Sequence, residues 1–206
     1  MKKLAVLLCL MFVILCVTGS SLAQTVGDNS YYFVTYYSNA NTSGAPDAVL
    51  RIVNDGAAAT AETEGVPNGT LWASIYVFDD SQELQECCSC PVSSDGLLSE
   101  SVNKQLLANT LTSKQETSRG VIKVISSATN DPTAVAIRAG LRSWATHIQA
   151  TSNIPEKGPF YVTETRLADS NLSPAELAAL ESSCSFAITL GSGSGVCSCT
   201  VEDTDF

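Results

Sequence analysis

The sequence predicts a mostly β domain, an Ig-like β-sandwich tied by disulfides, with one short helix near the C-terminus. Several short runs of β-branched and aromatic residues are separated by turn signals, a pattern typical of two packed sheets. Only one segment has a proper helix start signal, and six cysteines fall in two clusters. An α+β domain, in which the helix packs on a single sheet, is the alternative.

The first half of the chain predicts three strands. Tyr31–Ser38 and Ala48–Val53 are rich in residues that favour a pleated surface, and the turn-rich segment Asn39–Asp47 separates them. Thr70–Phe78 has apolar or aromatic side chains on both faces, so we expect a central strand that is covered on two sides. The Ala/Thr/Glu-rich segment 57–68 is expected to be an exposed loop.

The next part of the chain predicts less regular structure. Leu97–Leu111 has apolar residues near helical spacing, so a short helix or an irregular crossover is expected there. Gly120–Ser126 and Phe160–Leu167 have the composition of strands. Ala134–Ile148 holds enough apolar residues for one or two further strands.

One helix has a clear N-terminal signal. Ser173 is followed by proline and, three residues after the serine, by Glu176, which is a capping box with proline at the first helical position. The predicted helix runs from about Pro174 to Ser183. Phe186–Leu190 is then strand-like, and Gly191–Gly195 (GSGSG) is expected to be a flexible turn.

The N-terminus has the residue order of a secretory signal peptide. Lys2 and Lys3 precede the apolar run Leu4–Val17, and small and polar residues follow it. We place cleavage after Ala23, which gives a signal peptide at 1–23 and a single β-rich domain at 24–206. Lipid anchoring at Cys16 and an uncleaved anchor helix are the alternatives; the leucine before that cysteine disfavours the first.

The charge of the expected mature chain limits its partners. Removing the signal peptide leaves 9 basic and 21 acidic residues, a net charge of −12. Such a surface repels nucleic acid and anionic membranes, because phosphate binding needs clustered Lys or Arg. We therefore expect a secreted or periplasmic protein with no nucleic-acid partner and no membrane span after cleavage. The partners are unknown, and cell-surface and self-assembly contacts stay open.

The two cysteine clusters predict a disulfide framework. An even number of cysteines in an exported domain is typical of disulfide bonding, and six allow 15 connectivities. Because adjacent cysteines seldom bond each other, we expect the first cluster to pair with the second. Metal binding by clustered thiolates and a redox-active pair are the alternatives, but the spacing of structural zinc sites is absent, and no cofactor is expected. The six residues are Cys87, Cys88, Cys90, Cys184, Cys197 and Cys199.

Catalytic and metal-binding motifs are weak. His147 is the single histidine, and a small hydrolase centred on it would need a serine on a strained turn, for which the GSGSG segment lacks the strand-to-helix context. Asp79 and Asp80, and the acidic tail Glu202–Phe206, offer calcium ligands without the regular spacing of a calcium loop. No catalytic residue is therefore assigned.

Four tyrosines in the first predicted strand form the candidate ligand surface. Aromatic side chains stack on sugar rings, so this run could serve a carbohydrate-binding module; the alternative is that it fills both faces of a sheet. The residues are Tyr31, Tyr32, Tyr36 and Tyr37.

Four segments carry a resemblance to other exported proteins. The chain resembles a group of uncharacterised secreted six-cysteine proteins of soil bacteria, notably acidobacteria. The resemblance implies export and the six-cysteine arrangement, and it implies no activity, substrate or catalytic residue. The segments are YVFDDSQELQECCSCP (Tyr76–Pro91), GLRSWATHIQ (Gly140–Gln149), TETRLADSNLSPAELAALESSC (Thr163–Cys184) and GSGSGVCSC (Gly191–Cys199).

The function expected from these observations is that of an exported, non-enzymatic structural or binding protein of the periplasm or cell exterior. A carbohydrate-binding module that uses the Tyr31–Tyr37 aromatics and a small hydrolase centred on His147 are the competing expectations. Assembly into a filament or surface layer is a third.

Overall fold

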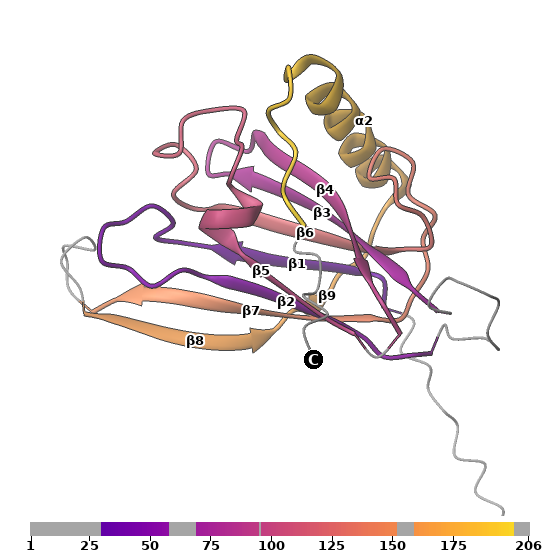
Figure 1. Ribbon diagram of the computed structural model, residues 1–206, viewed down its shortest axis with the longest axis horizontal. Helices are drawn as coiled ribbons and strands as arrows, with labels where there is room; N and C mark the ends of the chain where they lie inside the picture. The colour runs from indigo at the N-terminus through magenta and orange to yellow at the C-terminus, as the bar shows by residue number, and fades with distance from the viewer. Residues whose placement is uncertain (1–29, 58–68, 95, 152–158, 200–206) are drawn as a thin grey trace, which may run out of the picture.

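The computed structural model describes residues 30–57, 69–94, 96–151 and 159–199. The expected signal peptide, nearly all of the expected loop 57–68 and the acidic tail lie outside the described residues. Within them, two antiparallel sheets and one C-terminal helix form a mostly β protein (Figure 1). No helix among these residues is long and apolar enough to cross a membrane.

The first sheet, sheet A, has the strand order β4-β3-β6-β1-β9, and the second, sheet B, has the order β5-β2-β7-β8. A short π-helix, η1, follows β5, and α2 follows β9. The elements are β1 (Tyr32–Tyr37), β2 (Val49–Asn54), β3 (Leu71–Asp79), β4 (Leu84–Val92), β5 (Leu97–Ser101), η1 (Val102–Leu106), β6 (Gly120–Ser127), β7 (Leu141–Ala150), β8 (Phe160–Arg166), β9 (Ala168–Asp169) and α2 (Pro174–Leu190).

The main core lies between the two sheets. Strand periodicity sends alternate residues inward, so Leu50 and Ile52 of β2 face Ile75 and Val77 of β3 across one cluster of buried side chains. β3 is buried on both faces, because Tyr76 points to the other side and joins the residues under α2. The predicted central strand at Thr70–Phe78 is therefore confirmed.

α2 covers the outer face of sheet A, as the upper part of Figure 1 shows. The Ser173 side chain accepts a hydrogen bond from Glu176 N, which confirms the predicted cap. The Glu176 carboxylate also lies 2.6 Å from Lys123 Nζ and accepts a hydrogen bond from Tyr32 Oη at 3.3 Å. Leu180 and Cys184 supply the buried side of the helix.

Three disulfides join β4 to the C-terminal region, as expected from the two clusters. Cys87 bonds Cys184 on α2, whereas Cys88 and Cys90 bond the last described segment. Alternation along β4 places Cys87 toward the helix and the other two toward the main core. The partners of the latter two are Cys197 for Cys88 and Cys199 for Cys90.

Several sequence-based expectations are wrong in detail. Phe186–Leu190 was expected to be strand-like, yet α2 continues through it to Leu190, beyond the Cys184 anchor to β4. The expected short helix or irregular crossover at Leu97–Leu111 is confirmed in part, because the short π-helix η1 lies there but the strand β5 precedes it. No strand or helix was predicted for Leu84–Val92, which forms β4. The strand expected within Ala134–Ile148 is β7, which begins only at Leu141.

The two sheets are joined where the chain passes from β8 to β9. Leu167, between these strands, is 4% exposed and belongs to the main core. Its N–H donates to Ser143 O, so the chain is still held to sheet B when it turns to pair β9 with β1. β1 and β7 therefore lie close together at this side of the sandwich.

Candidate functional site

The cysteine cluster is a structural staple in its oxidised form. The Sγ atoms of Cys88, Cys90 and Cys199 lie within 4.8 Å of one another, which is close enough for a shared metal ion. All three are bonded in disulfides, however, and the ligand form of cysteine is the free thiolate. Three disulfides are typical of proteins that fold in oxidising compartments.

The four candidate tyrosines do not share one surface. Tyr32 is 4% exposed and lies under α2, and Tyr37 is 2% exposed and lies in the main core. Tyr31 is half-buried against the α2 side, so only Tyr36, at 47%, is well exposed. Burial raises the pKa of Tyr32 and Tyr37 far above that of a free phenol, so both stay protonated.

His147 lies at the join between the sheets and far from the GSGSG turn. Its Nε2 is 3.2 Å from Thr35 Oγ1 and 3.5 Å from Thr165 Oγ1, and its ring meets that of Tyr36 edge-on with centroids 4.2 Å apart. Burial lowers the pKa of this imidazole. The GSGSG turn lies beside β4, three strands away from β1, so its serines are not brought to His147.

The two adjacent aspartates that were considered for calcium have partners within the protein. Asp79 is 4% exposed, and its carboxylate accepts hydrogen bonds from Ser81 N and Glu83 N and from Gln85 Nε2. Asp80 pairs with Arg119 Nε at 2.6 Å. These carboxylates therefore shape the β3–β4 turn.

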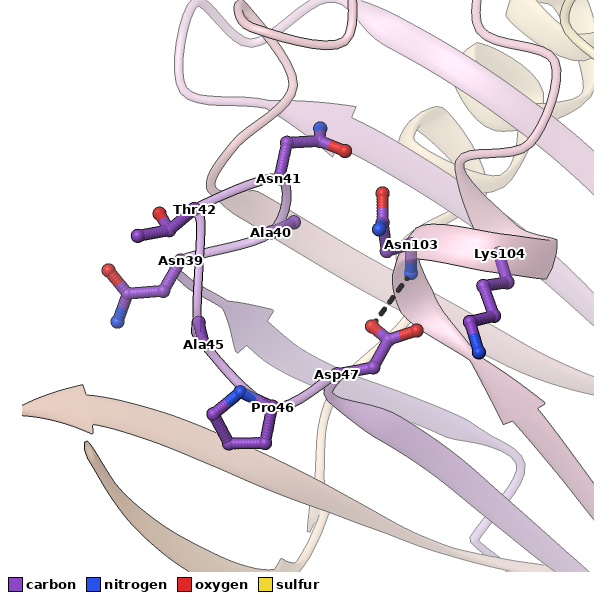
Figure 2. Close-up of a pocket in the computed structure, with 9 residues that line it drawn as sticks. All are labelled: Asn39, Ala40, Asn41, Thr42, Ala45, Pro46, Asp47, Asn103 and Lys104. Atoms are coloured by element: carbon purple, nitrogen blue, oxygen red, sulfur yellow. Dashed lines mark hydrogen bonds between the residues drawn. The ribbon is translucent and has the colours of Figure 1, made fainter. Parts of the chain in front are cut away.

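A polar pocket of about 260 Å³ lies where the β1–β2 loop faces η1. We call it the loop pocket. Figure 2 shows the loop 39–47 on one side, with the side chains of Asn103 and Lys104 projecting from η1 on the other. The lining residues are Asn39, Ala40, Asn41, Thr42, Ala45, Pro46, Asp47, Asn103 and Lys104.

The loop side of the pocket has unusual backbone geometry. Asn39 and Asn41 have φ values of 58° and 62°, in the left-handed region, which asparagine tolerates better than other residues with a side chain. Their amides fix this shape, because Asn39 Nδ2 donates to Ile148 O at 2.9 Å and Asn41 Nδ2 donates to Lys114 O at 2.6 Å. The loop is thus tied to two other segments.

Asp47 connects the loop to the π-helix. Its carboxylate accepts hydrogen bonds from Asn103 N, at 3.0 Å, and from the Ser101 hydroxyl. The Ser101 hydroxyl in turn accepts a bond from Lys104 N at 3.1 Å, which caps η1. One carboxylate therefore fixes the distance between the two walls of the loop pocket.

The far wall contains a polar atom without a partner. Asn103 Oδ1 is buried and accepts no hydrogen bond from the described residues. A buried acceptor in this state costs about 1 to 3 kcal/mol. Left-handed non-glycine residues and π-helical turns both occur frequently at functional sites, so three independent features coincide at the loop pocket.

No local sequence pattern assigns a role to this pocket. Asn39–Asp47 was predicted to be a turn, which the structure confirms, but Asp47 and Asn103 are 56 residues apart and only the fold brings them together. The one local signal of unusual backbone geometry was the presence of two asparagines, Asn39 and Asn41, in this turn.

The fold and these sites define a disulfide-tied, two-sheet β protein with a small polar pocket at one end of the strands. Comparison of the chain with protein-family models, with curated proteins and with solved structures found no match.

Proposed function

We propose that this chain is an exported, non-enzymatic binding protein of the periplasm or cell exterior, and that its ligand occupies the loop pocket. The signal-peptide pattern and the three disulfides support export. A loop held on a rigid β scaffold supports binding, because such loops position recognition groups with little loss of entropy. An Ig-like arrangement of the sandwich would suit this role.

The chemistry of the lining favours a saccharide. The lining residues carry amide, hydroxyl and carboxylate groups. Asn39, Asn41 and Asp47 use some of these groups to hold the loop, and the remaining donors and acceptors match the hydroxyl groups of a sugar. Pro46 and two alanines add small apolar surfaces for the C–H face of a ring. The volume is below the roughly 300 to 1,000 Å³ of sites that enclose drug-sized ligands, so we expect one or two sugar rings or the end of a chain.

The observation that carries this proposal is that Asn103 Oδ1 has no hydrogen-bond partner among the described residues. In Figure 2 the side chain of Asn103 projects from η1, on the side of the pocket opposite the loop. Asn103 Oδ1 is buried in the free protein, so a ligand hydroxyl that enters between the two walls gains a hydrogen bond to it once the Asn103 side chain turns to expose this acceptor. This hydrogen bond removes the free-energy cost that the free protein bears at the buried acceptor, so the removal of that cost strengthens binding.

A glycan array tests the proposal. The labelled exported protein, with its disulfides intact, is applied to an array of neutral and acidic saccharides of one to about four rings. We expect binding to a related subset of them, and binding about tenfold weaker for Asn103→Ala, equivalent to about 1.4 kcal/mol.

Asn171→Ala is the matched control, because it makes the same chemical change at an exposed residue that does not line the pocket. We expect it to bind as the wild type does. The proposal fails if no saccharide binds, or if Asn103→Ala and Asn171→Ala bind equally well.

A further inference from the structure

Sheet B ends in a strand that is exposed on both faces. β8 is the last strand in the order of this sheet among the described residues, at the lower side of Figure 1. Residues 161–166 are all exposed, and the exposed fractions of Tyr161 and Val162 are 67% and 51%. The edge of β4 in sheet A is different, because Gly195–Cys197 pairs alongside Cys87 there.

The hydrogen bonds to β7 show which backbone groups of β8 point outward. Leu167 N donates to Ser143 O, and Thr151 N donates to Pro159 O, which makes the odd-numbered residues the ones bonded to β7. In an antiparallel pair the bonded positions alternate with positions that point the other way. The even-numbered residues of β8 therefore direct their N–H and C=O groups to the outer edge.

We propose that β8 pairs with β8 of a second copy of this chain, antiparallel and across a two-fold axis. The register that overlaps the whole strand places Thr163 opposite Thr163 of the second copy. Val162 then lies opposite Glu164 of the second copy, and both positions have outward-directed backbone groups. The two copies of sheet B become one continuous sheet of eight strands.

The side chains of β8 suit this register. Thr163 faces Thr163 of the second copy on the two-fold axis, and Tyr161 faces Thr165 of the second copy. Pairs of threonines, and of an aromatic with a β-branched residue, both stabilise sheets when they lie opposite each other on neighbouring strands. Phe160 faces Arg166 of the second copy. No two like charges lie directly opposite each other.

The charge of β8 also favours a second copy as the occupant. The whole chain has a net charge of −10, so most of its surfaces repel another copy. β8 contains one acid and one base, Glu164 and Arg166, and is neutral. It also lacks proline and lysine, the residues with which edge strands commonly avoid pairing.

Sedimentation velocity of the exported protein, from about 1 to 100 µM, tests the proposal. We expect a reversible dimer. Val162→Pro removes an outward N–H from each copy and spares the bonds to β7, so it should weaken the dimer about tenfold or more. Val162→Thr keeps the N–H and is the matched control, expected to dimerise as the wild type does.

A charge pair tests the register. Thr163→Lys and Thr163→Glu each place like charges opposite each other and should weaken the dimer, whereas an equimolar mixture should give the heterodimer in native mass spectrometry. Thr163 is exposed, so both variants should fold. A wild type that is monomeric at 100 µM, a dimer that Val162→Pro leaves unchanged, or a mixture without excess heterodimer would overturn the proposal.

Discussion

Glu86 on β4 should make the stability of this protein fall as pH rises from about 4.5 to 7. Its side chain is fully buried, and its Oε1 accepts one hydrogen bond, from Asn109 N at 2.6 Å. Oε2 has no partner among the described residues. Burial raises the pKa of this carboxyl from 4.5 to about 7, although the Asn109 bond and the charge of Lys114 oppose the shift.

The size of the effect follows from the two pKa values. Between them the folded protein holds a proton on Glu86 that the unfolded chain has released, so the free energy of unfolding decreases as pH rises. The stabilisation is fully present below the unfolded value of 4.5 and is lost once pH passes the folded value of about 7. A difference of about 2.5 units corresponds to roughly 3 kcal/mol.

Urea denaturation of wild type and Glu86→Gln at intervals from pH 4 to 8, with the disulfides intact, measures this loss. The glutamine side chain of this variant keeps an oxygen that accepts the hydrogen bond from Asn109 N, and it does not ionise. The free energy of unfolding of the variant, relative to that of the wild type, should therefore rise by roughly 3 kcal/mol from pH 4 to 8.

Comparing the two proteins also cancels the contribution of His147. Burial lowers the pKa of that imidazole, so its contribution to stability changes with pH in the opposite direction to that of Glu86. The contribution is fully present above the unfolded pKa of 6.5 and is lost as pH falls through the lower pKa of the folded protein. Glu83→Gln, the same change at an exposed residue, is the matched control and should follow the wild type. Parallel curves for Glu86→Gln and wild type would refute the reasoning.

Four further variants have expected losses of stability. Gly120→Ala should destabilise by about 3 kcal/mol or more in thermal unfolding, since the new Cβ would lie 1.8 Å from Phe78 O. Ser173→Ala should cost about 1 kcal/mol, because it removes the cap of α2. With the Cys88–Cys197 link in place, the Cys87–Cys184 bond closes a loop of about 15 residues, whereas the Cys90–Cys199 bond closes one of only about six. Replacing the first pair by alanine should therefore cost about 3 kcal/mol, and replacing the second about 2 kcal/mol. The reverse order in urea denaturation would contradict this loop-closure argument.

Local patterns predicted the fold class and several elements, because those elements follow from short-range chemistry. The apolar run on both faces of Thr70–Phe78 marks a strand buried on two sides, whatever its neighbours are. The cap at Ser173 depends on residues three apart. The pairing between the cysteine clusters followed from the strain of a bond between adjacent cysteines.

Other elements depend on distant contacts and were mispredicted. β4 has three cysteines and two buried polar residues, Gln85 and Glu86, in place of an alternating apolar pattern, and its neighbours β3 and the C-terminal segment make it a strand. Phe186–Leu190 has strand-forming residues that continue a helix already held in place by Cys184. Tertiary packing overrides local preference in both segments.

The loop pocket was beyond sequence reasoning for the same reason. Local patterns predicted the turn of one wall and a short helix or crossover at the other, but not that the two lie together, because the Asp47 carboxylate that joins them acts across 56 residues. The tyrosine run, by contrast, attracted attention through composition alone, yet strand alternation directs its members to opposite faces of sheet A.

A ¹H–¹⁵N NMR titration of the labelled exported protein, with the saccharide that binds best on the array, tests most directly whether the loop pocket is the binding site. We predict saturable shifts of the backbone amides within 39–47 and 101–104, and no comparable shifts around Tyr36 and His147 at the join of the sheets. Saturable shifts confined to that join or to any other surface, with the loop pocket unaffected, would show that the ligand binds elsewhere.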